Sequence, residues 1–283
     1  MEAVFVAYKR ILTIQDISCL GQCSMTVALP VLSACGHETC ILPSKLLSTH
    51  TGGFGTPATE DLSAQMERTL QHWQSQGITF DAVLTGYLGS IAAVEAVEKI
   101  VDTVLIPGGV LIVDPAMADH GKLYAGLDEA YAQAMIRLCA RADVALPNLT
   151  EAAMMANLPS PGNSAELSVI LNRLEGKTVV LTGVGKGLEE TGVVVRTNEG
   201  VTHYTHKRIG KNYHGTGDLF AACFTGAWLY GLSLEGAASM AAELTCLCVE
   251  KTYMDPGHWY GIRFESILPE LIRRLSGKQT DCT

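Results

Sequence analysis

The chain has 283 residues, of which 48% are hydrophobic and 17% are charged, so it can bury a large core and is not compositionally disordered. Its formal charge of -9 argues against a nucleic-acid scaffold, because such proteins gain affinity by neutralising phosphates with lysine and arginine. The 28 glycines and 10 prolines follow no fixed period and no longer repeat is evident, which excludes collagen-like, propeller and solenoid architectures.

Short apolar runs alternate along the chain with segments of helical length. The runs cover residues 11–14, 40–42, 82–84, 110–113, 144–146 and 179–182, and the helical segments cover 59–76, 90–102, 128–141 and 164–174. This alternation is typical of βαβ units and predicts a mostly parallel sheet with helices on both faces. In such folds ligands gather at the carboxyl ends of the strands, so residues that follow the runs are candidates for a site.

The last third of the chain follows a different pattern. Residues 191–197 and 200–206 are joined at Asn198-Glu199-Gly200, which predicts a β-hairpin and therefore an antiparallel edge of the sheet. Helices are expected over 219–232, 233–251 and 264–275. No linker rich in proline, serine or charge interrupts the sequence, so we expect residues 1–283 to form a single domain.

The cysteines and the start of the chain indicate the cellular compartment. There are nine cysteines and none forms a C-x-x-C pair, so zinc is not expected and the default is reduced thiols packed as small hydrophobes. The apolar stretch before Lys9 is too short for a secretion signal, and no run approaches a membrane span. We expect a cytoplasmic protein with no membrane partner.

Phosphate chemistry is indicated by one glycine-rich segment. The common phosphate loop and the dinucleotide fingerprint are both absent, which disfavours a dehydrogenase. The segment Gly215, Thr216, Gly217 and Asp218 directly precedes a predicted helix, where free backbone amides can bind an anion and a carboxylate can stay ionised as a base. On these four residues alone, an ordinary helix cap is the favoured interpretation.

Six motifs in order resemble those of the ribokinase-like superfamily and, within it, the vitamin B6 kinases, over nearly the whole chain. They are TIQD at 13–16, STHTG at 48–52, LTGY at 84–87, DP at 114–115, PNLTEA at 147–152 and GTGDLFAA at 215–222. The resemblance implies a three-layer α/β/α sandwich with a mostly parallel central sheet and an antiparallel edge hairpin. It also implies ATP-dependent phosphorylation of the 5′-hydroxymethyl group of a B6 vitamer.

The resemblance assigns a role to each motif residue on the phosphate side. Asp218 is implied as the general base, with Gly215, Thr216 and Gly217 forming an anion hole for the transferred phosphoryl group. The resemblance assigns ATP binding to a further group of positions: Asp114, Asn148, Glu151, Thr182, Gly183 and Lys186. Of these, Asp114 and Glu151 are also implied as the residues that bind Mg²⁺.

Several of these positions have plainer interpretations. Asn148 and Glu151 equally match a capping box, and a lysine in a glycine-rich turn, such as Lys186, is commonly just solvated. Ala118 stands where many relatives have glycine, which puts the geometry of the loop after Asp114 in doubt. A cationic cluster before the anion hole fits either ATP steering or a charged strand edge: Lys207, Arg208 and Lys211.

On the substrate side, the resemblance places a group of residues around a pyridine ring: Asp16, His50, Thr51, Tyr87 and, on the next loop, Cys23. Tyr87 can stack on a flat ring while His50 and Thr51 supply hydrogen bonds. Asp16 stands where pyridoxal kinases commonly have serine. Its carboxylate can pair either with a protonated pyridine nitrogen or with the aminomethyl cation of pyridoxamine, which favours a cationic ligand. A strand-end aspartate that binds local amides is nearly as good an explanation.

Two rivals to this function remain. Hydroxymethylpyrimidine, the thiamine precursor, is accepted by closely related enzymes, and a nucleotide-binding regulator that has lost catalysis would keep the same fold. The presence of Asp218 and Glu151 argues against the regulator. The implied partners are ATP with Mg²⁺ and a small heteroaromatic alcohol, with a monovalent cation such as K⁺ and a homodimer suggested by the resemblance.

Overall fold

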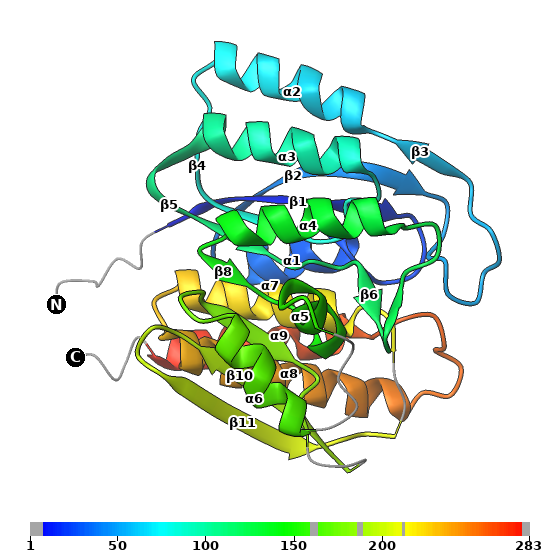
Figure 1. Cartoon of the computed structure of the whole chain (residues 1–283). Helices are drawn as coiled ribbons and strands as arrows, with labels where there is room; N and C mark the ends of the chain where they lie inside the picture. The colour runs from blue at the N-terminus through cyan, green and yellow to red at the C-terminus, as the bar shows by residue number, and fades with distance from the viewer. Residues whose placement is uncertain (1–7, 159–163, 186–188, 211–212, 279–283) are drawn as a thin grey trace, which may run out of the picture.

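A nine-stranded sheet runs through the part of the chain that the computed structural model describes, residues 8–158, 164–185, 189–210 and 213–278. The strand order is β11-β10-β9-β8-β5-β4-β1-β2-β3 (Figure 1). The strands are β1 (Arg10–Ser18), β2 (Glu38–Leu47), β3 (Thr59–Asp61), β4 (Phe80–Thr85), β5 (Leu105–Val113), β8 (Val144–Ala145), β9 (Val179–Thr182), β10 (Glu190–Arg196) and β11 (Val201–Lys207). A separate ribbon pairs β6 (Ala118–Asp119) with β7 (Lys122–Leu123).

The pairing of the strands confirms the expected sheet. The neighbours from β2 to β9 are all parallel. β10 pairs antiparallel with both β9 and β11, which confirms the hairpin and the antiparallel edge. At the other edge, β3 pairs antiparallel with the end of β2.

Helices cover both faces of the sheet (Figure 1). They are α1 (Met25–Ala34), α2 (Ser63–Ser75), α3 (Ile91–Val104), α4 (Glu129–Arg141), α5 (Leu149–Met155), α6 (Ser164–Arg173), α7 (Thr216–Leu229), α8 (Leu234–Tyr253) and α9 (Leu268–Lys278), with a 3-10 turn at Phe264–Ile267. Successive residues of β1 point to opposite faces, so Ile11 packs in the core beneath α1, α7, α8 and α9, and Leu12 in the core beneath α2, α3 and α4. None of the described helices is long and apolar enough to cross a membrane.

Two local predictions were wrong or incomplete. Residues 59–61 are the edge strand β3 rather than the start of a helix, because Asp61 and its neighbours pair with the end of β2 and α2 begins only at Ser63. The helix α1 was not expected, since Pro30 lies inside it and proline normally interrupts a helix. Burial of Val27, Ala28, Val31 and Leu32 against the sheet stabilises α1 in spite of Pro30.

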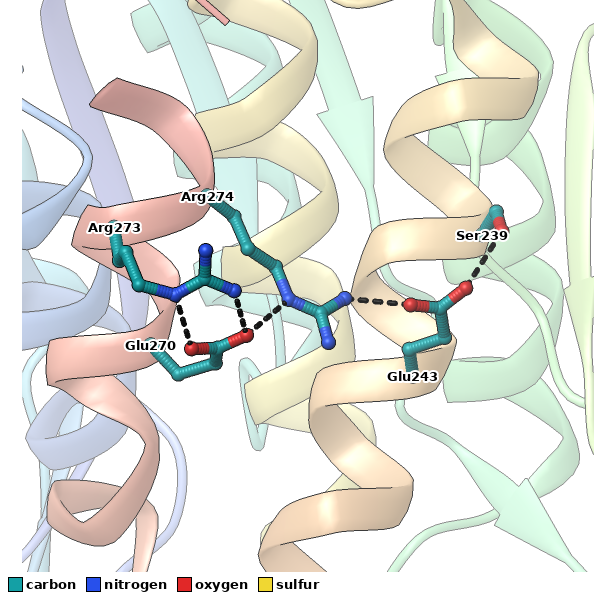
Figure 2. A network of polar contacts seen from close by, with 5 residues as sticks. All are labelled: Ser239, Glu243, Glu270, Arg273 and Arg274. Atoms are coloured by element: carbon teal, nitrogen blue, oxygen red, sulfur yellow. Dashed lines mark hydrogen bonds and ion pairs between the residues drawn. The ribbon is translucent and has the colours of Figure 1, made fainter. Parts of the chain in front are cut away.

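Ion pairs attach the last helix to α8. Figure 2 shows Arg274 between two carboxylates, with its Nε donating to Glu270 at 2.8 Å and an NH group donating to Glu243 of α8 at 2.5 Å. Arg273 donates twice to the same Glu270, and these hydrogen bonds lower the pKa of Glu270 to about 2. The network lies at the surface, so it orients α9 more than it stabilises the fold.

Candidate functional site

Neighbouring strands end at one edge of the sheet and bring residues from three motifs together. The backbone N–H of Asp16, near the end of β1, donates to the carbonyl of Tyr87, which follows β4, at 3.0 Å. The N–H of Asp114, directly after β5, donates to the carbonyl of Thr85 at 3.0 Å. The pairing of β1 with β2 shifts register between Gln15 and Ile17, so Asp16 lies at an irregularity of the strand.

The same edge continues toward β9 on the side assigned to the nucleotide. Thr182 forms a parallel bridge with Asn148, and its N–H donates to the carbonyl of Pro147 at 2.9 Å. Gly183 follows with a φ of 73°, so the chain turns directly after the strand. Lys186, assigned to ATP from the sequence, lies outside the described residues.

A pocket of about 500 Å³ opens at the carboxyl end of β11. It is lined by His206, Lys207, Arg208, Ile209, Gly210, Cys246, Glu250 and Tyr253. Because β11 is antiparallel to β10 and β10 to β9, this end of β11 lies at the same edge as Thr182. Lys207 and Arg208 are exposed beside the pocket, whereas Lys211 lies outside the described residues.

The glycine-rich segment begins α7. Gly215 is the N-cap residue, with a φ of 86° that favours glycine. A Cβ at this position would lie 2.3 Å from the carbonyl oxygen of Gln22, in the loop between β1 and α1. Gly215 therefore lets the start of α7 lie directly against the loop that follows Asp16, and the first amides of α7 have no acceptor within the helix.

Asp218 lies in the first turn of α7, close to Asp16. Ser24 lies close to both carboxylates: its backbone lowers the pKa of Asp218 and its side chain lowers the pKa of Asp16, in each case against the larger effect of burial. Ser18 also donates to Asp16 at 3.1 Å. The residues that the resemblance assigns as base and as pyridine ligand are thus neighbours in the structure.

Burial and mutual repulsion raise the pKa of the carboxylates that meet here. Burial raises the pKa of Asp16 to about 6, and the charge of Asp218 adds to this shift. Burial also raises the pKa of Asp218. Asp114 has a raised pKa because it is buried and close to the charges of Glu151 and Asp218. Such an arrangement favours a cation, which would relieve the repulsion among the carboxylates.

Glu151 forms the capping box that the sequence left as one of two interpretations. Its side chain accepts from the N–H of Asn148 at 2.9 Å, and the Asn148 side chain accepts from the N–H of Glu151 at 3.0 Å. The same carboxylate also accepts from Met117 at 2.8 Å and from Ala118 at 3.2 Å. Glu151 therefore connects the loop after Asp114 to α5, and burial raises its pKa to about 7 despite these bonds.

The donor set suits Mg²⁺ without enclosing it. Carboxylate oxygens are ligands that Mg²⁺ prefers, and burial together with the charges of Glu151 and Asp218 raises the pKa of Asp114. No group of three or more His, Cys, Asp or Glu side chains within the described ranges is close enough to hold a metal ion by itself. This fits an ion held by one or two carboxylates, water and the phosphates of a nucleotide.

The loop after β2 reaches the start of α7 through two histidines. The ring centroids of His50 and His214 are 4.2 Å apart, and burial with the charge of His214 lowers the pKa of His50 to about 4. His50 Nδ1 accepts from the N–H of Gly52 at 2.9 Å, so Nε2 carries the proton of the neutral ring and can donate. The side chain of Thr51, the residue after His50, is exposed.

The other two residues assigned to the vitamer differ in their surroundings. Tyr87 is half-buried, and burial together with the charge of Asp16 raises its pKa, so the phenol stays protonated. Cys23 is buried beside Ser18 and Ser24, and burial raises the pKa of its thiol strongly. A protonated thiol is a poor nucleophile, which fits a packing role for Cys23.

Three residues of this region were missed in the sequence. Ser24 precedes an unrecognised helix, and nothing in the local sequence distinguishes it from other serines. Tyr124 lies close to the charges of Glu151 and Asp114, but its motif is not distinctive. His214 directly precedes the glycine-rich segment, and that position was a usable signal.

Comparisons with known proteins agree on one family. A family model described as phosphomethylpyrimidine kinase matches residues 52–262. A pyridoxal kinase from Arabidopsis thaliana is 26% identical over 265 residues, covering 87% of this chain and 83% of that protein.

Solved structures lead to the same group of proteins. The crystal structure of pyridoxal kinase from Lactobacillus plantarum superimposes with a TM-score of 0.88 at 33% identity, covering 94% of this chain and 98% of that one. A putative phosphomethylpyrimidine kinase from Bacteroides thetaiotaomicron, crystallised with pyridoxal, gives a TM-score of 0.87 at 30% identity, covering 94% of this chain and 96% of that one. The chain is therefore similar over almost its full length to a pyridoxal kinase and to a putative phosphomethylpyrimidine kinase.

Proposed function

Because this chain belongs to the phosphomethylpyrimidine kinase family, we propose that it transfers the γ-phosphoryl group of ATP to the 5′-hydroxymethyl group of a vitamin B6 vitamer. The fold is ribokinase-like, and relatives at 26% to 33% identity are pyridoxal kinases. The observation that carries the proposal is that Asp218, at the start of α7, lies close enough to both Asp16 and Asp114 for its charge to raise their pKa values. A base between a ring-binding group and a phosphate-side carboxylate suits transfer from nucleotide to alcohol.

In the proposed mechanism, Asp218 accepts the proton of the vitamer hydroxyl as the oxygen of that hydroxyl attacks the γ-phosphorus. The bond from the γ-phosphorus to the β–γ bridging oxygen breaks at the same time, and ADP leaves. The raised pKa of Asp218 makes its carboxylate a stronger base than an exposed aspartate. The first amides of α7, from Gly215 to Gly217, bind the oxygens of the transferred group, where charge accumulates. Mg²⁺, when bound with ATP near Asp114, neutralises charge on the phosphates.

The two ends of the site divide the substrates between them. Asp16, His50, Thr51 and Tyr87 surround the vitamer ring. The nucleotide lies along the ends of β8, β9 and β11. Its phosphates lie near Asn148, Thr182 and Gly183, and its base lies toward the pocket beside Tyr253. Lys207 and Arg208 steer the approach of the nucleotide anion. Support for this division comes from the bridge between Asn148 and Thr182 and from the pocket at the same edge.

A coupled assay of ATP turnover tests the proposal across pyridoxal, pyridoxamine, pyridoxine and hydroxymethylpyrimidine. Phosphorylation of at least one B6 vitamer is the expected result. Hydroxymethylpyrimidine is the second candidate, since the matching family model is described as phosphomethylpyrimidine kinase. Competition between the two alcohols ranks them by kcat/KM. ATP binding without turnover of any of the four would instead support a regulatory protein.

Four further properties follow from the sequence or from the resemblance, and each has its own measurement. We propose a single domain, a homodimer, activation by a monovalent cation such as K⁺, and a cytoplasmic location. One cooperative unfolding transition tests the first, sedimentation the second, replacement of K⁺ by a larger organic cation the third, and cell fractionation the fourth.

The Asp16→Ser substitution is expected to weaken use of pyridoxamine selectively. A hydrogen bond to a charged group contributes about 1.5–3 kcal/mol, so kcat/KM for pyridoxamine should fall roughly ten-fold to a hundred-fold. Because the pKa of Asp16 is raised to about 6, the pyridoxamine rate of the parent should also decline as the pH falls through 6. Unchanged ratios of kcat/KM for pyridoxamine and pyridoxal would contradict the selectivity, and equal losses for all vitamers would indicate contact with the shared ring nitrogen.

The Glu151→Gln substitution separates the metal role of Glu151 from its capping role. An amide has one acceptor oxygen in place of two, so its NH₂ group would face a backbone N–H, and the melting temperature should fall. If Glu151 also supports Mg²⁺, the Mg²⁺ concentration for half-maximal activity should rise. A lower melting temperature with a superimposable Mg²⁺ titration would show that Glu151 only shapes the loop.

A further inference from the structure

Ser24 has a backbone conformation that serine rarely adopts. Its φ is 49° and its ψ is −127°, and the residue is only 6% exposed. It occupies the N-cap position of α1, where a serine side chain normally accepts from an amide of the first turn. Ser24 makes no such bond. A buried residue held in a strained conformation without its usual local bond indicates that the surrounding structure uses it for something else.

The polar groups of Ser24 point to two carboxylates from distant parts of the chain. The side chain lies close to Asp16 on β1 and lowers its pKa, and the backbone lies close to Asp218 on α7 and lowers its pKa. Both interactions favour the ionised form of their carboxylate, which opposes the effect of burial.

We infer that Ser24 is a positioning residue for the transfer reaction: it holds the ring-side carboxylate Asp16 and the base Asp218 in one fixed arrangement. The inference rests on the proposed function. Its backbone N–H orients the base toward the hydroxyl to be phosphorylated. Its hydroxyl keeps Asp16 ionised for a cationic vitamer, and one residue thus relates the position of the ring to that of the base.

The groups around Asp16 determine how its titration is read. Asp218 of α7 raises its pKa, and Ser18 and Ser24 lower it. Tyr87, after β4, and Cys23 also face Asp16, and both have raised pKa values, so they stay neutral near pH 6. Loss of the Ser24 hydroxyl should therefore move the titration of Asp16 to higher pH, and the tyrosine and thiol do not titrate in that range.

Two substitutions separate the hydroxyl from the strain. Ser24→Ala removes the hydroxyl and keeps the strained φ, whereas Ser24→Gly removes the hydroxyl and relieves the strain. Both should lower kcat/KM for the preferred vitamer roughly ten-fold or more. The acid limb of the kcat/KM profile should shift to higher pH in both. The glycine variant should melt above the alanine variant, and both should remain poorer enzymes than the parent.

Matched controls lie away from the site. Ser233 is an exposed serine that caps α8 in the usual way, so Ser233→Ala should lower the melting temperature and leave the kinetics unchanged. Asn157 has a φ of 52° after the end of α5. Asn157→Gly therefore relieves the strain of another side chain at positive φ without touching Asp16. If Ser24→Ala behaves like Ser233→Ala, Ser24 is merely structural and the inference fails.

A carbon-13 NMR titration of the unliganded protein gives a readout that does not need turnover. The Asp16 carboxyl signal, assigned with Asp16→Asn, should titrate at higher pH in Ser24→Ala than in the parent. An unchanged titration would overturn the inference even if the parent is an active kinase. If the parent phosphorylates no vitamer, the proposed function fails, and the positioning role for the reaction falls with it, whereas the titration still shows whether Ser24 controls Asp16.

Discussion

Asp218→Asn is expected to lower kcat by about 10²–10⁴-fold while the fold and ATP binding are retained. The amide keeps the shape of the side chain but cannot take a proton from the attacking hydroxyl. Because burial raises the pKa of Asp218, removal of this partly buried charge should leave the melting temperature unchanged or higher. Steady-state kinetics, ATP titration and thermal unfolding measure the three effects.

Asp102→Asn provides the comparison for this result. Asp102 is an exposed aspartate on α3 that pairs with Arg141, so its loss should leave turnover unchanged and affect stability only slightly. A near-normal kcat for Asp218→Asn would remove Asp218 as the base. A general loss of folded protein would show that the carboxylate is needed for structure, which its raised pKa argues against.

Gly215→Ala is expected to lower turnover by about 10²–10³-fold, the range for loss of a donor that stabilises developing charge. The added Cβ would lie 2.3 Å from the carbonyl oxygen of Gln22, and the φ of 86° disfavours alanine in any case. The start of α7 must then move away from the loop after β1, which displaces both the amides and Asp218. The melting temperature should fall as well.

Gly36→Ala separates the strain from the close approach. Gly36 has a φ of 88°, but nothing lies within 4 Å of the Cβ that alanine would add. It should lose stability comparable to the strain alone, about 1–2 kcal/mol, with unchanged kinetics. If Gly215→Ala resembles Gly36→Ala in both measurements, the contact between α7 and Gln22 is not required for transfer.

The sequence was sufficient for most of the sheet because the signals there are local and repeated. Buried parallel strands contain continuous apolar runs, so the apolar parts of β1, β4, β5 and β9 could be located from the sequence. The hairpin of β10 and β11 carried its own turn residues. Short elements were harder: β3 is three exposed residues that pair only through their backbone, and α1 contains Pro30.

The site divides in the same way. Residues within motifs, such as Asp114 and Asp218, could be named because the resemblance gives each a position. The contacts of Glu151 with Met117 and Ala118 could not, since they join segments that no local pattern relates. Ser24 illustrates the limit, because its importance lies in a backbone angle and in two distant carboxylates.

The contact between Gln22 and Gly215 has a consequence for the way the protein is made. Ribosomes release the N-terminal segment first, so Asp16 and Ser24 emerge long before the helix that must lie against them. A nascent chain without α7 and α8 would expose the sheet face that carries Ile11, Ala82 and Ile112. Such a chain lacks Asp218, the proposed general base, and presents apolar surface to chaperones and proteases. Premature termination should therefore yield products that are cleared rather than idle competitors for vitamer or nucleotide.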